Sequence, residues 1–286
     1  YISLNIYSFW LFFPLSQFAT FIGTYRQAEA SLANYTALMN TAPEAKALRP
    51  QSIGPVTELA FNTVSFGYKS ATSSALSEIS YQVSRGQTIA FVGPSGSGKS
   101  TLLSLIGALR PIQKGKLQVC QYDMGQSKAS MHLIRRQIGY VFQQHNLLNF
   151  LTARQNVEMT LEMLGDDDES SRKEKSLDML DKVGLKKEAN KYPPELSVGQ
   201  RQRVAIARSL VHQPRLILAD EPTASLDGKS GAQVVELLRD MVKTAGCGAL
   251  VVTHDERIFH YADAILRIED GVIYGEAREG GHDVRV

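Results

Sequence analysis

The sequence predicts an α/β fold with a mainly parallel sheet, an antiparallel β portion before it and a helical subdomain inserted into it. From about residue 56, short apolar runs alternate with helical patterns, an order typical of parallel strands joined by crossover helices. Four of these apolar runs are followed directly by glycine, glutamine, acidic residues or histidine. Buried parallel strands are continuously apolar, and their carboxyl ends lie at one edge of the sheet. The sequence therefore predicts a single site at that edge.

The first run, 88–92, is followed by Gly93, and the second, 138–142, by Gln143. The third, 216–219, is followed by Asp220 and Glu221, and the fourth, 249–253, by His254. Near the end of the chain, 265–274 is typical of two strands joined by an Asp270–Gly271 turn.

The segment from about 145 to 210 predicts the helical subdomain. Thr152 and Gln155 form a capping-box pattern, and Gly165 is suited to end the helix that they begin. The acidic run 166–169 is interpreted as a solvated loop, and a second helix is expected to end at Gly184.

Composition excludes nucleic acid as the expected partner. Apolar residues make up 43% and charged residues 21% of the chain, which is typical of a globular protein. The 31 basic and 29 acidic side chains leave a formal charge of only +2, so there is no general attraction for polyanions. Cys120 and Cys247 match no metal-binding spacing and are expected to be reduced core thiols, with a disulfide as the alternative.

Residues 1–25 carry no charged side chain and are long enough to cross a membrane as a helix. This helix would be truncated if the sequence is part of a longer protein. Because the first residue is Tyr1 rather than Met, we expect such a longer protein. A buried or interfacial helix is the alternative, which Asn5, Pro14 and Gln17 favour. Residues 26–55 are interpreted as a helical extension and linker, 56–276 as the catalytic domain and 277–286 as a tail.

The segment 93–101, Gly-Pro-Ser-Gly-Ser-Gly-Lys-Ser-Thr, follows the first of the four strands and fits the pattern of a phosphate-binding loop. Glycines allow the backbone to wrap around phosphate with its N–H groups pointing inward, and the next helix directs its positive end at the same anion. Lys99 would reach the β- and γ-phosphates of ATP, and Ser100 would ligate Mg²⁺. A flexible Gly/Ser loop is the alternative, but the strand before it and the helix after it favour a P-loop NTPase. The predicted nucleotide contacts are Gly93, Pro94, Ser95, Gly96, Ser97, Gly98, Lys99, Ser100 and Thr101.

Asp220 and Glu221 complete the predicted phosphate site. A strand would carry Asp220 to the Mg²⁺, and Glu221 would lie where the attacking water sits. An apolar run that ends in two acidic residues is weak evidence alone, and the phosphate loop is what strengthens it.

The segment 196–200, Leu-Ser-Val-Gly-Gln, and the basic helix pattern after it resemble the signature LSGGQ of the ATP-binding cassette family. Ser197 and Gln200 are also an ordinary capping box, and the two interpretations are compatible because a capped helix N-terminus is an anion site. The resemblance implies that Ser197, Val198, Gly199 and Gln200 meet the γ-phosphate held by a second, identical subunit, so that two ATP molecules lie between two cassettes. Val198 replaces the family's glycine, and its β-branched side chain predicts reduced or altered activity.

The resemblance covers about residues 56–276 and implies further roles. Tyr68 would stack on adenine, with a core tyrosine as the alternative, and Gln143 would connect Mg²⁺ to the helical subdomain. Asp227 would pass signals between subunits. His254 would hold the γ-phosphate and the water in line, which makes Glu221, His254 and Lys99 the expected catalytic residues.

The segments 25–28, 43–44 and 64–68 make residues 1 to about 90 resemble the last membrane helix, linker and first strands of an exporter half-transporter. From about residue 102, the segments 138–143, 145–148 and 151–157 resemble the lipoprotein-releasing and macrolide-exporter branch, including the ATPase of the heterocyst glycolipid exporter. The resemblance implies an ATPase on the cytosolic face of the cytoplasmic membrane, partnered by a transmembrane permease domain or subunits and coupled to export of a lipid or glycolipid. The alternative is a soluble or degenerate cassette that acts as an ATP-dependent switch. This sequence contains neither the long coiled-coil insertion that is usual in a DNA-repair cassette nor the second cassette of a translation factor, so neither class is expected.

Overall fold

The computed structural model describes Glu29, which lies in a helix, and residues 58–68, 74–84, 86–124, 128–165 and 168–277. The chain divides into two compact units, Tyr1–Ala47 and Leu48–Val286, and all described residues except Glu29 belong to the second. The predicted membrane helix, the extension and linker apart from Glu29, and the tail beyond Ala277 lie outside the described residues. Among the described residues, no helix is long and apolar enough to cross a membrane.

The strands of the second unit are β1 (Glu58–Phe66), β2 (Leu76–Ser84), β3 (Thr88–Val92), β4 (Lys114–Val119), β5 (Tyr122–Asp123), β6 (Ile138–Val141), β7 (Leu216–Asp220), β8 (Gly248–Val252), β9 (Ala264–Glu269) and β10 (Val272–Ala277). The helices are α2 (Lys99–Ile106), α3 (Lys128–Gln137), α4 (Ala153–Leu164), α5 (Glu169–Lys182), α6 (Val198–Leu210), α7 (Gly228–Ala245) and α8 (Glu256–Phe259).

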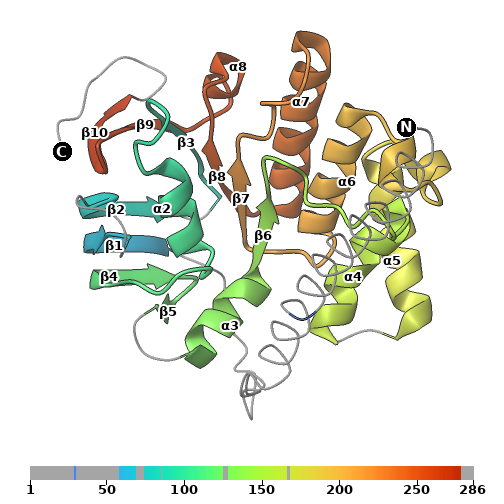
Figure 1. Ribbon diagram of the computed structural model, residues 1–286, viewed down its shortest axis with the longest axis horizontal. Coiled ribbons are helices and arrows are strands. Elements are labelled where there is room, and N and C mark those ends of the chain that lie inside the picture. The colour runs from blue at the N-terminus through green and yellow to red at the C-terminus, as the bar shows by residue number, and fades with distance from the viewer. Residues whose placement is uncertain are drawn as a thin grey trace, which may run out of the picture. The chain divides into compact units, whose positions relative to one another are not determined.

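Two sheets form the α/β part, as Figure 1 shows. The larger sheet has the order β10-β9-β3-β8-β7-β6, and its strands from β9 to β6 are parallel. The smaller sheet, β2-β1-β4-β5, is antiparallel. The predicted fold class, a mainly parallel P-loop sheet with an antiparallel portion and a helical insertion, is therefore confirmed. β9 and β10 form the predicted hairpin, with Asp270 at φ 46° and Gly271 at φ 78° in its turn.

Alternate side chains of the parallel strands enter two different cores. Ile89 and Phe91 pack with α2 and the antiparallel sheet, whereas Ala90, between them, packs with the helices on the other face. The same alternation holds along β7 and β8. Because both faces of each strand are covered, an unbroken apolar run is the pattern that the fold requires.

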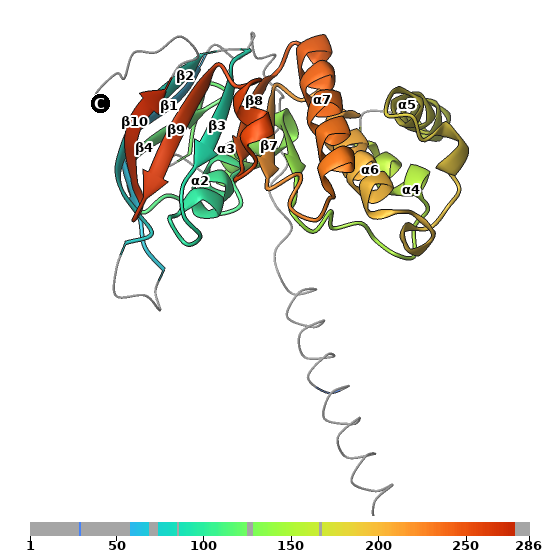
Figure 2. The same cartoon turned by 90° about the horizontal axis from the view of Figure 1, so that it is seen from above.

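The helices α4, α5 and α6 form a layer at the end of the domain away from the antiparallel sheet (Figure 2). Thr152 and Gln155 cap α4 reciprocally, and Gly165 ends it at φ 73°, both as predicted. The interpretation of the acidic run as a loop was wrong for Asp168 and Glu169. The Asp168 carboxylate accepts from the Ser171 N–H at 2.7 Å and so begins α5, of which Glu169 is the first residue.

Candidate functional site

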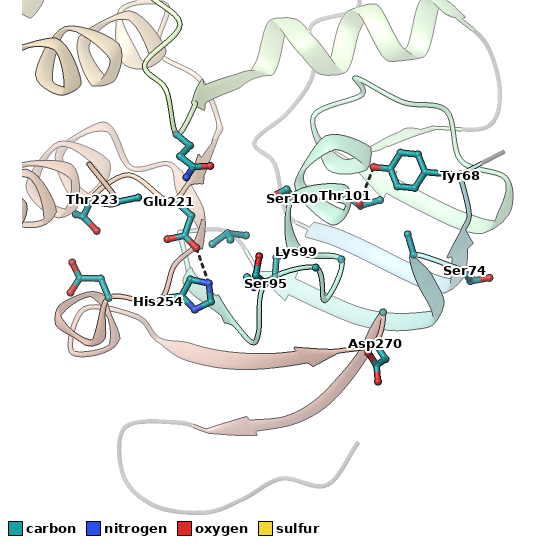
Figure 3. Close-up of a pocket in the computed structure, with 18 residues that line it drawn as sticks. Tyr68, Ser74, Ser95, Lys99, Ser100, Thr101, Glu221, Thr223, His254 and Asp270 are labelled. Carbon is teal, nitrogen blue, oxygen red and sulfur yellow. Dashed lines mark hydrogen bonds and ion pairs between the residues drawn. The ribbon is translucent and has the colours of Figure 1, made fainter. Parts of the chain in front are cut away.

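The ends of β3, β8, β7 and β6 are adjacent, and a cleft of about 1050 Å³ opens beside them (Figure 3). Of the residues predicted to bind nucleotide or to act in catalysis, those that line the cleft are Tyr68, Ser95, Gly96, Gly98, Lys99, Ser100, Thr101, Gln143, Glu221 and His254. Residues from four separate strand ends therefore face one space large enough for a nucleotide.

Two glycines of the phosphate loop are required by geometry. Gly93 has φ 151°, and a Cβ built on it would lie 1.9 Å from the carbonyl oxygen of Ile268. Gly98 caps α2 at φ 102°, and its Cβ would lie 2.4 Å from the carbonyl oxygen of Ala75. Any side chain at either position would displace the neighbouring backbone. The loop is thus held between β9 and the segment before β2.

The Lys99 ammonium is enclosed by the loop. Its Nζ donates to the carbonyl oxygens of Gly93 at 2.6 Å and Pro94 at 2.7 Å, and to Ser97 Oγ at 3.3 Å. Burial lowers the pKa of Lys99, while the carboxylates of Glu221 and Asp220 act to raise it. The three donors of an ammonium are all used here, so a phosphate would exchange with at least one of these acceptors.

Ser100 and Asp220 meet where a metal ion would be held. Ser100 Oγ donates to Asp220 Oδ1 at 3.1 Å, and burial raises the pKa of that carboxyl. No group of three His, Cys, Asp or Glu side chains within the described ranges could hold a metal by itself. A hydroxyl and one carboxylate fit Mg²⁺, which takes oxygen ligands and keeps places for phosphate oxygens and water.

Glu221 and His254 form a pair across the cleft from Tyr68 (Figure 3). His254 Nε2 lies 3.2 Å from Glu221 Oε1. Glu221 occupies the left-handed region at φ 48°, held by the bond from its N–H to Val252 O at 2.9 Å. A non-glycine residue in this region stores strain, which is typical of functional sites. Burial raises the pKa of Glu221, and His254 opposes that rise.

Tyr68 lies at the opposite side of the cleft. Its side chain is 36% exposed, so the alternative of a core tyrosine was wrong. Its hydroxyl lies 3.0 Å from Thr101 Oγ1, and the Arg110 guanidinium carbon lies 4.9 Å from its ring centroid. The cation therefore covers one face of the ring, and an adenine would stack on the other face or take the place of Arg110.

The signature residues do not line this cleft. Ser197 and Gln200 cap α6 reciprocally, with Gln200 N donating to Ser197 Oγ at 3.2 Å and Ser197 N donating to Gln200 Oε1 at 2.9 Å. Val198 is 36% exposed at the first position of the helix. Asp227 caps α7 instead, and its carboxylate accepts from the N–H groups of Lys229 and Ser230 at 3.0 Å. One chain therefore presents the signature at its surface, apart from its own phosphate loop.

Sequence reasoning missed several lining residues, which are Ser74, Ala75, Thr223, Ala224, Val252, Asp255, Asp270 and Gly271. The sequence predicted the Asp270–Gly271 pair as a hairpin turn and not as part of the cleft. The structure adds that Gly271 N donates to Ser97 O at 3.0 Å, so this turn supports the phosphate loop. Asp255, beside His254, had no signal beyond its position.

The sequence matches the family model described as ABC transporter over residues 76–224. It is 40% identical over 214 residues to the uncharacterized ABC transporter ATP-binding protein MJ1508 of Methanocaldococcus jannaschii, across 73% of this chain and 93% of that protein. It is 41% identical over 206 residues to the lipoprotein-releasing system ATP-binding protein LolD of Legionella pneumophila, across 71% of this chain and 89% of that one.

Among solved structures, the fold is similar to the dimeric post-hydrolysis state of the ATP-binding cassette MJ0796 bound to ADP and Pi. The TM-score is 0.72 at 35% identity, over 78% of this chain and 100% of that one. The family match covers more than half of the chain, and the relatives are covered almost completely. The chain therefore belongs to the ABC transporter family and is an ATP-hydrolysing cassette of that family.

Proposed function

We propose that this cassette couples Mg-ATP-driven dimerisation and hydrolysis to the export of a lipid-containing substrate across the cytoplasmic membrane, from its cytosolic face. The observation that carries the proposal is the meeting of Lys99, Ser100, Glu221 and His254 in one cleft at the strand ends. These are the groups that phosphoryl transfer to water needs, namely a cation, a metal ligand, a base and a second polar group.

In the proposed reaction, Glu221 accepts a proton from the water whose oxygen attacks the γ-phosphorus. The bond from that phosphorus to the bridging oxygen breaks, so ADP leaves and inorganic phosphate is formed. Its partner His254, 3.2 Å away, orients the carboxylate and contacts the same phosphate. Lys99 and the loop N–H groups bind the oxygens on which charge builds. Ser100 and Asp220 would hold Mg²⁺, which supplies further neutralisation of the phosphate charge. Gln143, also at the cleft, would sense the occupied site and signal to the helical subdomain.

Dimerisation with a second copy is supported by the placement of the signature. The N-terminus of α6 is an anion-binding element, yet none of its residues lines the cleft beside the chain's own phosphate loop. We propose that it completes the site of a partner cassette through Ser197 and Gly199, and that Val198 lowers the rate by crowding that contact.

Coupling to a membrane partner is supported by exposed apolar side chains on the helical subdomain side. Phe150, between Gln143 and α4, is 73% exposed, and Met163 on α4 is 78% exposed. We propose a transmembrane permease as the partner of Phe150, because the segment of Phe150 joins Gln143 at the cleft to α4, so that contact there reaches the nucleotide site. Phe150→Ser should leave basal ATP hydrolysis unchanged and remove the change in hydrolysis that membranes holding the permease cause in the wild type. An equal response of both forms to those membranes would contradict this docking.

The lipid-containing cargo is the proposal that best fits a sequence 41% identical to a lipoprotein-releasing ATPase. Loading of a fluorescent lipid, a glycolipid or a lipopeptide into inverted vesicles, with and without ATP, distinguishes these cargoes. ATP-independent accumulation of all three would contradict the proposal.

The ATPase part is tested by hydrolysis across protein concentrations, with Glu221→Gln as the reference. Turnover that rises more steeply than concentration and vanishes in Glu221→Gln would support the dimeric catalyst. No turnover at any concentration, with ATP still bound, would instead favour the soluble or degenerate switch.

A further inference from the structure

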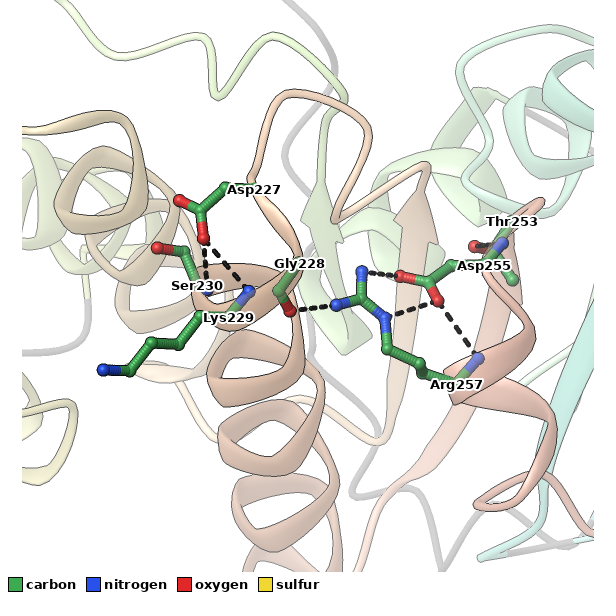
Figure 4. Close-up of polar contacts among 7 residues, drawn as sticks. All are labelled: Asp227, Gly228, Lys229, Ser230, Thr253, Asp255 and Arg257. Carbon is green, nitrogen blue, oxygen red and sulfur yellow. Dashed lines mark hydrogen bonds and ion pairs between the residues drawn. The ribbon is translucent and has the colours of Figure 1, made fainter.

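The segment that carries His254 is tied to helix α7 by an arginine outside the predicted site. Asp255 directly follows His254, and its side chain is only 14% exposed. The Arg257 guanidinium grips this carboxylate with two bonds, from Nε at 2.7 Å and from Nη2 at 2.5 Å (Figure 4). The carboxylate also accepts from Arg257 N at 3.0 Å, and Asp255 N donates to Thr253 Oγ1 at 2.9 Å. The local backbone is therefore fixed on both sides of His254.

The remaining guanidinium nitrogen reaches the first turn of α7. Arg257 Nη1 donates to the carbonyl oxygen of Gly228. A Cβ built on Gly231 would lie 2.5 Å from Arg257 Nη2 and 3.0 Å from Nη1, so this glycine leaves the space that the guanidinium occupies. A planar fork with five donors can bind a carboxylate and a carbonyl at once, which an ammonium on a flexible stem cannot reproduce.

The same turn of α7 adjoins the signature. Asp227 caps it, and a Cβ built on Gly199 would lie 3.8 Å from Ser230 Cβ. One turn further on, Arg203 of α6 donates to Gln233 Oε1 at 3.1 Å. The start of α7 therefore touches both the segment of His254 and the helix that begins with the signature.

We propose that Arg257 is a positioning residue that couples His254 to the start of α7, so that a partner cassette arriving at Asp227 and the signature sets the position of His254. Arg257 is not among the residues that line the cleft, whereas its partner Asp255 is, so Arg257 acts through Asp255. This inference rests on the proposed roles of His254 and of the dimer.

The test compares kcat and KM for ATP in Arg257→Gln, Arg257→Lys, Gly231→Ala and the double variant Gly231→Ala/Arg257→Gln. Arg239→Gln is the matched control, because Arg239 is as exposed as Arg257 and also pairs with a nearby aspartate, Asp240 at 2.6 Å, but lies beyond the first turn of α7. Gly231→Ala should displace the guanidinium without unfolding, since alanine favours a helix and the contact is with a side-chain end.

Arg257→Gln and Arg257→Lys should each lower kcat about tenfold while KM for ATP and the melting temperature change little, because misplacement of a reacting group affects the rate more than binding. Gly231→Ala should lower kcat in the wild-type background and have no effect beside Arg257→Gln. Arg239→Gln should match the wild type.

Unchanged kcat in Arg257→Gln, full activity in Arg257→Lys, or additive effects in the double variant would overturn the coupling. So would a fall in kcat that is matched by loss of melting temperature and ATP affinity, since that is what a purely structural clamp would give. Glu221→Gln is measured beside them. Normal turnover in Glu221→Gln would contradict the proposed function itself and is thereby distinguished from failure of the coupling.

Discussion

The two parts of the ATP machinery in this chain are built in opposite ways. At the strand-end cleft, burial disfavours the charged forms of three side chains: it lowers the pKa of Lys99 and raises the pKa values of Asp220 and Glu221. Glu221 also has a left-handed backbone conformation. At the start of α6, Ser197 and Val198 are exposed, and Ser197 and Gln200 cap the helix reciprocally. Burial of charge at the cleft therefore lowers the stability of the folded protein, whereas capping stabilises the start of α6.

Stability and activity should therefore respond differently to mutation in the two parts. Removing a charge from the cleft relieves an electrostatic cost and removes chemistry. Removing a cap from α6 loses local stability and, in the proposed dimer, also a contact with the partner's nucleotide. We therefore expect substitutions that lower ATP hydrolysis to raise the stability of the protein only when they lie in the cleft.

Glu221→Gln should lower turnover by about 10²- to 10⁴-fold, the usual contribution of a general base. It should also raise the melting temperature of the nucleotide-free protein at neutral pH. The folded pKa of Glu221 is raised by burial, so the folded state binds the proton more tightly than the unfolded state. Ionisation above that pKa therefore destabilises the fold, and glutamine removes the cost. If Glu221→Gln lowered the melting temperature and kept full turnover, the proposed difference between the cleft and the start of α6 would be contradicted.

Ser197→Ala should cost about 1 kcal/mol of stability through the lost cap. Turnover should fall about tenfold through the lost anion contact, with ATP binding by the same chain unchanged. Thr152→Ala is the matched control, because Thr152 and Gln155 form the same capping box at α4. That control should lose stability to the same extent and keep its turnover. Equal loss of turnover in both variants would show that capping alone explains the effect.

Val198→Gly should raise turnover by about threefold if the side chain crowds the partner's nucleotide. The exposed position at the start of α6 makes the cost to the core small. Steady-state ATP hydrolysis at saturating ATP measures this, and unchanged turnover would exclude Val198 from the residues that tune the rate.

The acid limb of the kcat/KM profile, which reports the free enzyme, should lie above pH 4.5, the ordinary pKa of a glutamate, because burial raises the pKa of Glu221. Only the ionised carboxylate can accept a proton, so activity is lost as pH falls through the raised value. Profiles measured between pH 4.5 and 8 test this at constant ionic strength. A limb at or below pH 4.5 would contradict a buried base.

Much of the fold was predictable because each local pattern agreed with the tertiary environment. The apolar runs of β3, β6, β7 and β8 predicted strands covered on both faces, and the two capping boxes marked the starts of α4 and α6. Asp168 was missed because an acidic run gives the same pattern whether it is solvated or caps a helix.

The candidate site was predictable where a motif carries its own chemistry, as in the phosphate loop and Glu221. It was not predictable where contacts join segments distant in sequence. Arg257 and Gly231 are separated by 26 positions and neither has a local pattern, yet only a glycine leaves room for the guanidinium. The same holds for the Gly271 turn that supports Ser97.

Complementation between two inactive variants tests most directly the claim that the cleft of one chain needs the signature of another. Lys99→Ala disables a chain's own phosphate loop, and Gly199→Asp places a negative charge and a side chain in its signature. In a mixed dimer, the loop of the second variant meets the signature of the first, and both are intact. An equal mixture should recover about one quarter of wild-type activity, because half of the dimers are mixed and each contains one intact site of two. A mixture as inactive as its two components would contradict the account.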